Sequence, residues 1–233
     1  MEYIVKKILF LFALILIYNA LCPQDLISAN DYNTPREKEI YPRFRIAVAC
    51  GYSYRTAREP EGITKNDANY GKAKNGFHYL GEFDYFFNES VGIGINYNAS
   101  YFNFADNYRS DKVQIRQIMP TLNARVFDKK KESAFLVSMG IGCNNYRNDY
   151  WWIEKHNSKK NINTTKDWGV GFLCSAGYDL AFSQTMAAFF QISFSGGTGI
   201  SINDYTYHKQ SYFRIDRDDF GKFNFSIGLR FSK

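Results

Sequence analysis

The sequence predicts an all-β fold, an eight-stranded antiparallel up-and-down transmembrane β-barrel that follows an N-terminal signal peptide. Three observations carry this prediction. The 233 residues are polar on average, with a mean hydropathy of −0.39, although 21 are Phe, 18 are Tyr and 3 are Trp. Apolar and polar residues alternate in eight segments after residue 42. Short and long connections alternate between these segments, which is typical of outer-membrane barrels.

The first twenty residues predict export. Lys6 and Lys7 precede the apolar run Ile8–Tyr18, whose 11 residues suit a signal-peptide core and are too few for a transmembrane helix. Ala20 offers a small residue for cleavage, so residues 1–20 are predicted to be the signal peptide. Lipidation at Cys22 is disfavoured because Leu21, the residue before it, is not small.

The rest of the chain divides into a lead-in and a barrel. Residues 21–42 are polar and contain three prolines, and they are predicted to be a periplasmic lead-in to a barrel over 43–233. No later segment approaches 18 apolar residues, so no helical anchor is expected. The mature protein is then either soluble outside the cytoplasm or inserted in a membrane as a β-barrel.

The first four predicted strands carry apolar side chains at every second position, as a strand with one apolar face does. Their apolar faces run over Phe44–Tyr54, Phe77–Phe87, Val91–Tyr101 and Ile118–Val126. The intervening positions are small or polar. Because side chains of a strand alternate between its two faces, each segment predicts one apolar and one polar surface.

The last four strands follow the same rule. Their apolar faces run over Phe135–Cys143, Trp168–Leu180, Ala188–Phe194 and Phe223–Phe231. The predicted strands have about 9–15 residues, which fits tilted membrane-spanning strands better than the shorter strands of globular proteins. Eight strands place both chain ends on one side of the barrel.

The connections predict which side is which. Tight turns are expected at Asn88–Ser90, Asp128–Glu132 and Phe182–Thr185, and long polar loops at 58–75, 105–112, 147–166 and 197–218. Short turns on the periplasmic side and long loops outside are typical of outer-membrane barrels. The predicted location is therefore the cell outer membrane.

The polar face is predicted to line the interior, because bulky Phe, Tyr, Ile and Val suit lipid while Gly and Ser suit a narrow lumen. Tyr and Trp near strand ends are expected to form girdles at the membrane interfaces. A buried charge needs a partner, so the inner charges should form a polar network. Its predicted members are Arg43, Arg45, Glu82, Asp84, Arg125, Asp179 and Arg230. A soluble barrel with an apolar interior stays open as an alternative.

Motifs for metal, cofactor or nucleic-acid chemistry are missing from the sequence. Cys50, Cys143 and Cys174 are odd in number and widely spaced, and they are predicted to be small outward-facing hydrophobes. The net charge of +6 is scattered in short clusters, unlike a nucleic-acid-binding face. No cofactor, metal or nucleic-acid partner is expected.

A weak signal for catalysis comes from His156 and Ser158, which have the His-x-Ser spacing that barrel lipid hydrolases use. They fall in a Lys/Asn-rich loop, whereas a catalytic pair needs a fixed mount. His78 and His208 have no acid and nucleophile nearby in the sequence. The protein is expected not to be an enzyme, and no catalytic residue is assigned.

Aromatic residues in the predicted loops form a candidate interaction surface, because exposed aromatics often mark binding sites. These residues are Tyr150, Trp151, Trp152, Tyr205 and Tyr207. The alternative is that strands five to eight continue above the membrane and these side chains cover one another.

Three stretches carry a resemblance to a known family. Gln117–Phe127, followed by a charged turn and Ser133–Gly142, and later Ser175–Leu180, resemble the small outer-membrane β-barrel proteins of Bacteroidetes-type bacteria. These porin-family barrels are similar to the transmembrane domain of outer-membrane protein A. The resemblance implies that the last strand is recognised by the barrel-assembly machinery, although Ser232 and Lys233 replace the family's terminal aromatic residue.

The expected function follows from this architecture. The first expectation is a structural or adhesion-like role through long extracellular loops. Alternatives are a narrow porin-like channel for ions or small solutes, a lipid hydrolase, and a soluble exported barrel that binds an apolar ligand. The expected partners are outer-membrane lipid, the assembly machinery and an unidentified extracellular partner.

Overall fold

The computed structural model describes residues 41–56, 73–105, 109–128, 133–153, 160–183, 185–207 and 210–233. The predicted signal peptide and nearly all of the predicted lead-in lie outside these residues. The strands are β1 (Phe44–Arg55), β2 (Asn75–Phe86), β3 (Val91–Ala105), β4 (Arg109–Phe127), β5 (Ala134–Ile153), β6 (Lys160–Ala181), β7 (Met186–Tyr207), β8 (Gln210–Asp219) and β9 (Lys222–Ser232). Within the described ranges, no helix is both long and apolar enough to cross a membrane.

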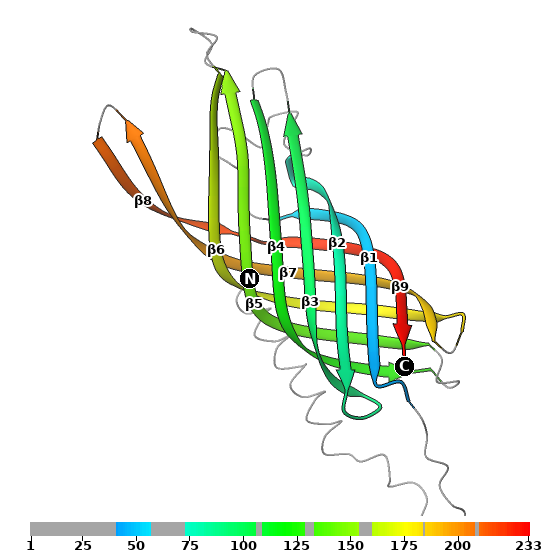
Figure 1. Ribbon diagram of the computed structural model, residues 1–233. Coiled ribbons are helices and arrows are strands. Elements are labelled where there is room, and N and C mark those ends of the chain that lie inside the picture. Colours follow the sequence, from blue (N-terminus) through cyan, green and yellow to red (C-terminus); the bar gives the residue numbers. More distant parts are fainter. Residues whose placement is uncertain are drawn as a thin grey trace, which may run out of the picture. The chain divides into compact units, whose positions relative to one another are not determined.

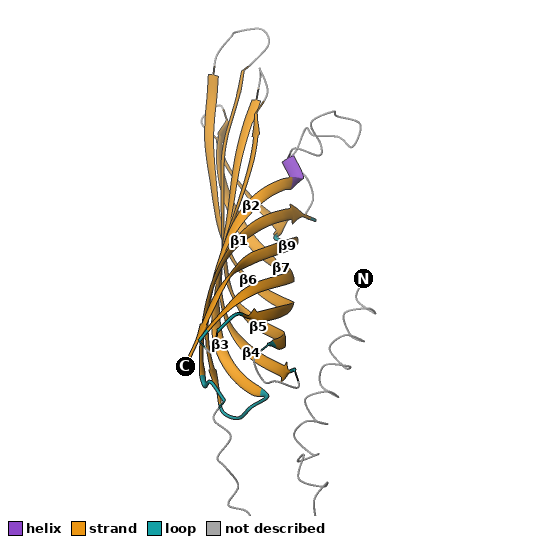
Figure 2. Cartoon of the chain, turned by 90° about the vertical axis from the view of Figure 1, so that its right-hand side faces the viewer, coloured by secondary structure: helices purple, strands orange, loops and turns teal. Residues whose placement is uncertain are grey.

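The strands close into one antiparallel barrel (Figures 1 and 2). Their order is β6-β5-β4-β3-β2-β1-β9-β7-β8, and an additional β6–β7 pairing completes the ring. β8 and β9 both pair with β7 and are separated only by Phe220 and Gly221, so they share one place in the wall. The barrel therefore has eight strand positions, which confirms the predicted fold class.

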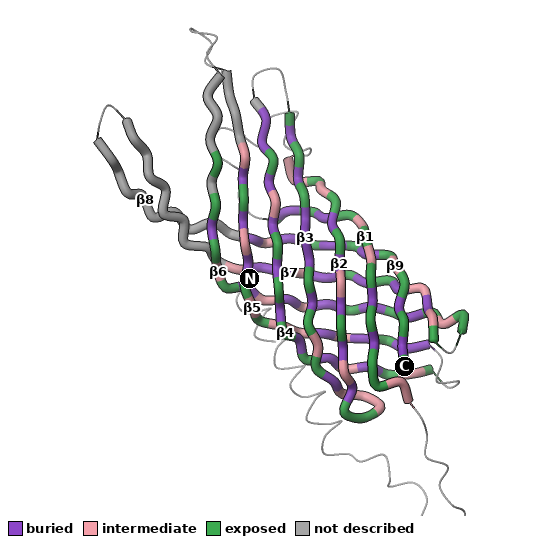
Figure 3. Tube along the Cα trace, in the orientation of Figure 1, coloured by how far each residue is buried: buried purple, intermediate pink, exposed green. Residues whose placement is uncertain are grey.

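The polarity of the barrel is inverted relative to a water-soluble protein. Buried and exposed residues alternate along the strands (Figure 3). Val48, Ile95 and Ile227 face outward with about half of their surface exposed, at 52%, 54% and 54%, whereas Arg45 and Asn98 face inward and are each 1% exposed. The polar face lines the interior, as predicted. The alternative of a soluble barrel required the opposite arrangement, with an apolar interior and a polar outer face.

The two ends of the barrel differ. At the terminal end, Phe44 N donates to Lys233 O over 2.9 Å, and the three short turns lie here. One of these turns closes with a bond from Asp128 N to Ser133 O of 2.8 Å. The loop end holds the connections between β1 and β2, β3 and β4, β5 and β6, and β7 and β8. The connections that were predicted to be tight turns thus lie at one end of the barrel, and those predicted to be long loops lie at the other.

Aromatic side chains gather on the outer face near both ends. At the terminal end, the Phe44 ring lies 5.2 Å from that of Tyr85. Nearer the loop end, the Phe77 and Tyr79 rings meet edge to face at 4.8 Å, and Tyr79 lies 6.0 Å from Tyr101. These two zones match the predicted girdles, where amphipathic rings sit at membrane–water interfaces.

Three of the predicted long loops are mostly strand, which corrects the predicted boundaries. β4 begins at Arg109, β5 and β6 extend to Ile153 and from Lys160, and β7 and β8 fill most of 197–218. The hydrophobic pattern missed these extensions because their outward residues, such as Arg116 and Arg147, are polar as well. The predicted loop 58–75 lies mostly outside the described residues.

Ile95→Lys, in the middle of the outer apolar belt on β3, is expected to lower the free energy of unfolding in lipid vesicles by about 2–4 kcal/mol. The reason is that an ammonium group at that depth loses its hydration. Denaturant unfolding of the refolded protein measures the change. Asn103→Lys, also outward on β3 but nearer the loop end, is the control. An equal effect at both positions would show that the outer apolar belt does not mark the part of the wall that meets lipid.

Candidate functional site

The interior holds three levels between the terminal end and the loop end. The charge cluster comprises Arg45, Glu82, Asp84, Asp179 and Arg230. The polar level contains His78, Asn98, Ser100, Lys222 and Ser226. The hydrophobic plug is formed by Phe102, Val113, Ile115, Tyr146 and Phe220. The order follows from β9, along which Arg230, Ser226 and Lys222 succeed one another toward the loop end, and from Phe220, which lies just before β9.

Arg45 is the centre of the charge cluster. Its Nη1 donates to Glu82 Oε2 and to Asp84 Oδ2, each over 2.7 Å. Its Nε and Nη2 donate to the two oxygens of Asp179 over 3.1 and 3.3 Å. Asp84 lies directly opposite Arg45 in the β1–β2 register, whereas Asp179 reaches it from β6. One guanidinium group therefore joins three strands of the wall.

Neutral side chains complete the cluster. Glu82 Oε1 accepts from Asn96 over 2.9 Å and from Gln191 over 2.8 Å, and Asp84 Oδ1 accepts from Asn123 over 2.7 Å. Arg230 Nε lies 3.4 Å from Asp179 Oδ2. Gly94 leaves the room that Asp84 occupies, since a Cβ there would lie 2.1 Å from Asp84 Oδ1. Satisfied carboxylates of this kind fit a structural role better than a catalytic one.

Two of the predicted network residues behave differently. Arg125 is buried, but it donates to Glu89 O and Pro42 O over 2.7 Å and stacks on Phe86, with Cζ 3.6 Å from the ring centroid. Arg125 thus connects the turn between β2 and β3 with the segment that precedes β1. Arg43 has the inward parity, but it precedes β1 by one residue and its side chain is exposed at the barrel's end.

Lys222 is the main feature of the polar level. It is fully buried, and its Nζ donates to Asn98 Oδ1 over 2.8 Å and to Ser100 Oγ over 2.6 Å. Among the residues that the structure describes, no carboxylate lies within ion-pair distance of it. The alternation placed Lys222 on the inner face, but only the closed barrel shows that it crosses from β9 to β3.

His78 and Ser226 form a pair that the sequence did not predict. His78 Nε2 lies 2.8 Å from Ser226 Oγ, the spacing of a base and a nucleophile. His78 is 0% exposed and Ser226 is 7% exposed, so neither is presented at the barrel surface. The pair fits a structural hydrogen bond between β2 and β9. The predicted hydrolase residues His156 and Ser158, and also His208, lie outside the described residues.

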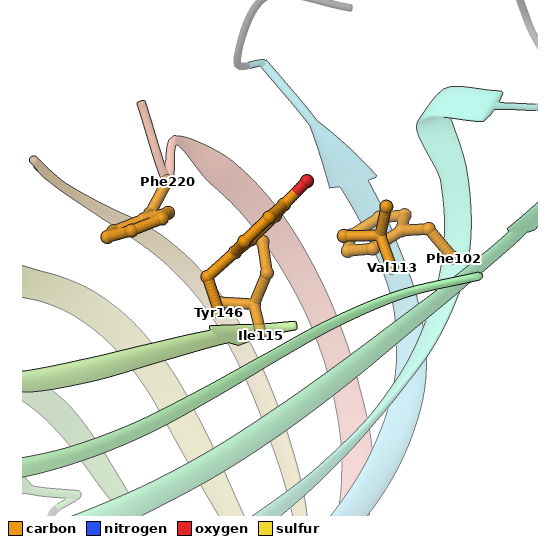
Figure 4. Packing of buried hydrophobic residues seen from close by; sticks show 5 residues of the cluster. All are labelled: Phe102, Val113, Ile115, Tyr146 and Phe220. Carbon is orange, nitrogen blue, oxygen red and sulfur yellow. The ribbon is translucent and has the colours of Figure 1, made fainter. Parts of the chain in front are cut away.

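The hydrophobic plug crosses the interior below the loop end (Figure 4). The Tyr146 and Phe220 rings stack with centroids 5.6 Å apart. Phe102, Val113 and Ile115 pack beside them, and all five residues are buried. Tyr146 lies beyond the apolar face that the sequence predicted for this strand, Phe135–Cys143, and the structure places it inside the barrel on β5. The plug and the charge cluster thus occupy two successive levels of the interior.

The predicted loop aromatics lie on extended hairpins. Trp151 and Trp152 pair with β4 and β6, and Tyr150 pairs with Asn163. Tyr205 and Tyr207 pair with Tyr212 and Gln210 in the β7–β8 hairpin. Their side chains lie outside the described part of the structure, so the surface they were predicted to form stays a prediction.

The cysteines carry no metal chemistry in the described part of the chain. Cys50 and Cys143 are exposed on the outer face, Cys174 is half-buried, and all three are free thiols. Within the described ranges, no group of three or more His, Cys, Asp or Glu side chains could hold a metal ion. The cysteines face outward, as predicted.

Lys222→Met is expected to raise the free energy of unfolding by about 1 kcal/mol, because a buried ammonium group without a counter-charge costs more than an apolar chain of similar length. Urea unfolding in vesicles measures this change. Lys222→Ala removes the same charge but leaves a cavity, so it should be less stable than Lys222→Met by about 2 kcal/mol. A loss above about 2 kcal/mol for Lys222→Met would show that the bonds to Asn98 and Ser100 dominate.

Comparison with known proteins gives matches to solved structures alone. No protein-family model matches the sequence, and no curated protein matches it. The attachment invasion locus protein Ail of Yersinia pestis aligns with a TM-score of 0.48 at 11% identity, over 82% of this chain and 100% of that chain. Neisserial surface protein A aligns with a TM-score of 0.47 at 11% identity, over 82% of this chain and 97% of that chain. The outer membrane protein OprG of Pseudomonas aeruginosa aligns with a TM-score of 0.47 at 10% identity, over 83% of this chain and 96% of that chain.

Proposed function

We propose that the protein is an outer-membrane β-barrel in which the barrel is a membrane anchor and the loop end is a platform for surface interactions. The observation that carries the proposal is the inverted polarity of the wall. Outward side chains such as Val48 and Ile227 are half exposed, while Arg45 and its carboxylates are buried. A bilayer satisfies such an apolar belt, and a closed barrel leaves no unpaired strand edge in lipid.

The interior supports an anchor rather than an open pore. The charge cluster joins β1, β2 and β6 through Arg45, and the buried side chains of the hydrophobic plug pack together nearer the loop end. An ion would have to pass both levels. This arrangement gives rigidity to the wall, since each carboxylate of the cluster draws two or more strands together.

One observation favours the second candidate, a narrow channel. Several interior polar atoms have no hydrogen-bond partner, among them Asn98 Nδ2, Gln117 Oε1 and Asn144 Nδ2. Such atoms are normally satisfied by water. A hydrated polar level between the two obstructions would need only small rearrangements to connect with either end.

The loop end suits a platform because its hairpins project separately. The β6–β7 pairing ends at Trp168↔Ile200, whereas β5–β6 continues to Ile153↔Lys160 and β7–β8 to Tyr207↔Gln210. The two hairpins diverge beyond that point (Figure 1).

The proposal assigns no enzymatic activity, so Ser226→Ala and Ser158→Ala should leave the membrane lipid profile unchanged. It assigns recognition by the assembly machinery to β9.

Cell fractionation tests the anchor. The protein is expected in carbonate-washed outer membranes, and its electrophoretic migration should shift on heating. Recovery in the soluble fraction would overturn the proposal. The platform is tested by an epitope tag inserted within 154–159, which antibodies should reach on intact cells. A tag in the turn after Asp128 is the matched control and should be reached only after lysis.

A further inference from the structure

The outer surface of β4, β5 and β6 changes from apolar to basic within a few residues at the loop end. The strand register defines four successive outward rows. From the belt toward the loop end they are Ile118, Cys143 and Val170; Arg116, Asn145 and Trp168; Gln114, Arg147 and Lys166; Lys112, Asp149 and Thr164. The first row is the last fully apolar one, and Trp168 marks the interface, where tryptophan is enriched in membrane proteins.

Four of these outward residues are cations, and they form what we call the basic face: Lys112, Arg116, Arg147 and Lys166. All four side chains are exposed. Asp149 is the only carboxylate in the four rows, so the face carries a net charge of +3, from four cations and one anion. No described outward stretch of β1, β2 or β3 combines charges in this way.

Asp149 compensates one cation. Arg147 Nε donates to Asp149 Oδ2 over 2.9 Å, and Thr164 Oγ1 donates to Asp149 Oδ1 over 2.8 Å. Partial burial would raise the pKa of Asp149, but the hydrogen bonds from Thr164 and Arg147 and the charges of Arg147 and Lys166 outweigh it and hold that pKa below its ordinary value. Asp149 is therefore ionised at neutral pH and is already engaged.

The other cations have no carboxylate partner in the described part of the chain. Arg147 and Lys166 lie directly opposite each other in the β5–β6 register, and like charges at such positions repel. Arg116 meets a neutral group, since the Gln114 amide oxygen, in the orientation that satisfies its neighbours, accepts from Arg116 Nε over 2.9 Å and from Tyr101 OH over 2.8 Å. Lys112, Arg116 and Lys166 are therefore exposed cations that can meet an external anion.

We propose that the basic face binds the phosphate groups of an anionic lipid in the leaflet at the loop end. This inference rests on the proposed membrane insertion. Arginine and lysine side chains at headgroup depth attract lipid phosphates, and arginine adds directional hydrogen bonds. The face lies directly beyond the last fully apolar row of the wall. A phosphate-bearing lipid is held there at both ends, its acyl chains by Ile118 and Val170 and its headgroup by Arg116, Arg147 and Lys166.

The experiment uses the full-length protein in a zwitterionic detergent. Fluorescent lipid A carrying its phosphates, and the same lipid without phosphates, are titrated and followed by fluorescence anisotropy at low salt. The phosphorylated lipid is expected to bind at least about ten-fold more tightly. Arg147→Gln with Lys166→Gln should remove most of that preference. Arg43→Gln with Lys233→Gln removes the same charge from exposed sites at the terminal end and should leave the preference unchanged.

Three results would overturn the inference. One is equal binding of the two lipids by the wild-type protein, and another is an equal loss of preference in both double variants, which would show a general charge effect. The third is displacement of the phosphorylated lipid by millimolar inorganic phosphate, which would make the site one for the free anion. Failure of membrane insertion is seen separately, because the protein would then show no heat-dependent migration in vesicles of phosphatidylcholine.

Discussion

Arg45→Met is expected to lower the free energy of unfolding by about 3–5 kcal/mol, because it leaves three buried carboxylates without their central cation. Glu82, Asp84 and Asp179 all bond to this guanidinium group over 2.7–3.3 Å. Arg230 lies farther from the carboxylates than Arg45 does, with its Nε 3.4 Å from Asp179 Oδ2. Urea unfolding of the refolded protein in lipid vesicles, followed by heat-dependent migration, measures the loss.

The control for Arg45→Met is Arg43→Met, which removes the same side chain two residues away at an exposed site and should change stability by no more than about 0.5 kcal/mol. A second variant separates charge from packing. Adding Glu82→Gln to Arg45→Met removes one of the stranded carboxylates, so the double variant should recover part of the loss. A loss below about 1 kcal/mol for Arg45→Met, or no recovery in the double variant, would contradict the role of Arg45 as the central cation.

Alternation was enough to predict which residues face the interior. Side chains alternate strictly along a strand, so Arg45, Glu82, Asp84 and Asp179 could be placed on one surface from the sequence. The pattern could not choose the arginine that meets all three carboxylates. That choice depends on the β1–β2 register, which puts Arg45 opposite Asp84, and on the reach of Asp179 across the barrel.

The sequence missed features that arise only from closure of the barrel or lie past the end of the outer apolar belt. His78 meets Ser226 because β1 joins β2 on one side and β9 on the other, a neighbourhood that no local pattern contains. The strand extensions around Arg147 and Lys166 were predicted as loops because both of their faces are polar. Hydrophobic alternation indicates a strand only where one face is apolar, and the basic face lies past the last apolar row.

Phe220→Ala is expected to lower the free energy of unfolding by about 3–5 kcal/mol, since the ring is fully buried and its removal leaves a cavity beside Tyr146. Phe220→Leu, which keeps most of the volume, should lose no more than about 1.5 kcal/mol. Urea unfolding in vesicles measures both. A similar loss in the two variants would show that Phe220 acts through something other than its volume.

The same variant tests how the lumen is obstructed. Because the hydrophobic plug and the charge cluster lie in series, removing one should leave the other in place. In planar bilayers, Phe220→Ala and Arg45→Met are therefore each expected to give no steady current steps, whereas the double variant should give them. Steps in the wild-type protein would favour the channel over the anchor. Current steps in only one of the two single variants would show that the unchanged level does not close the lumen by itself. The residue changed in that variant would then be the one that blocks the passage of ions.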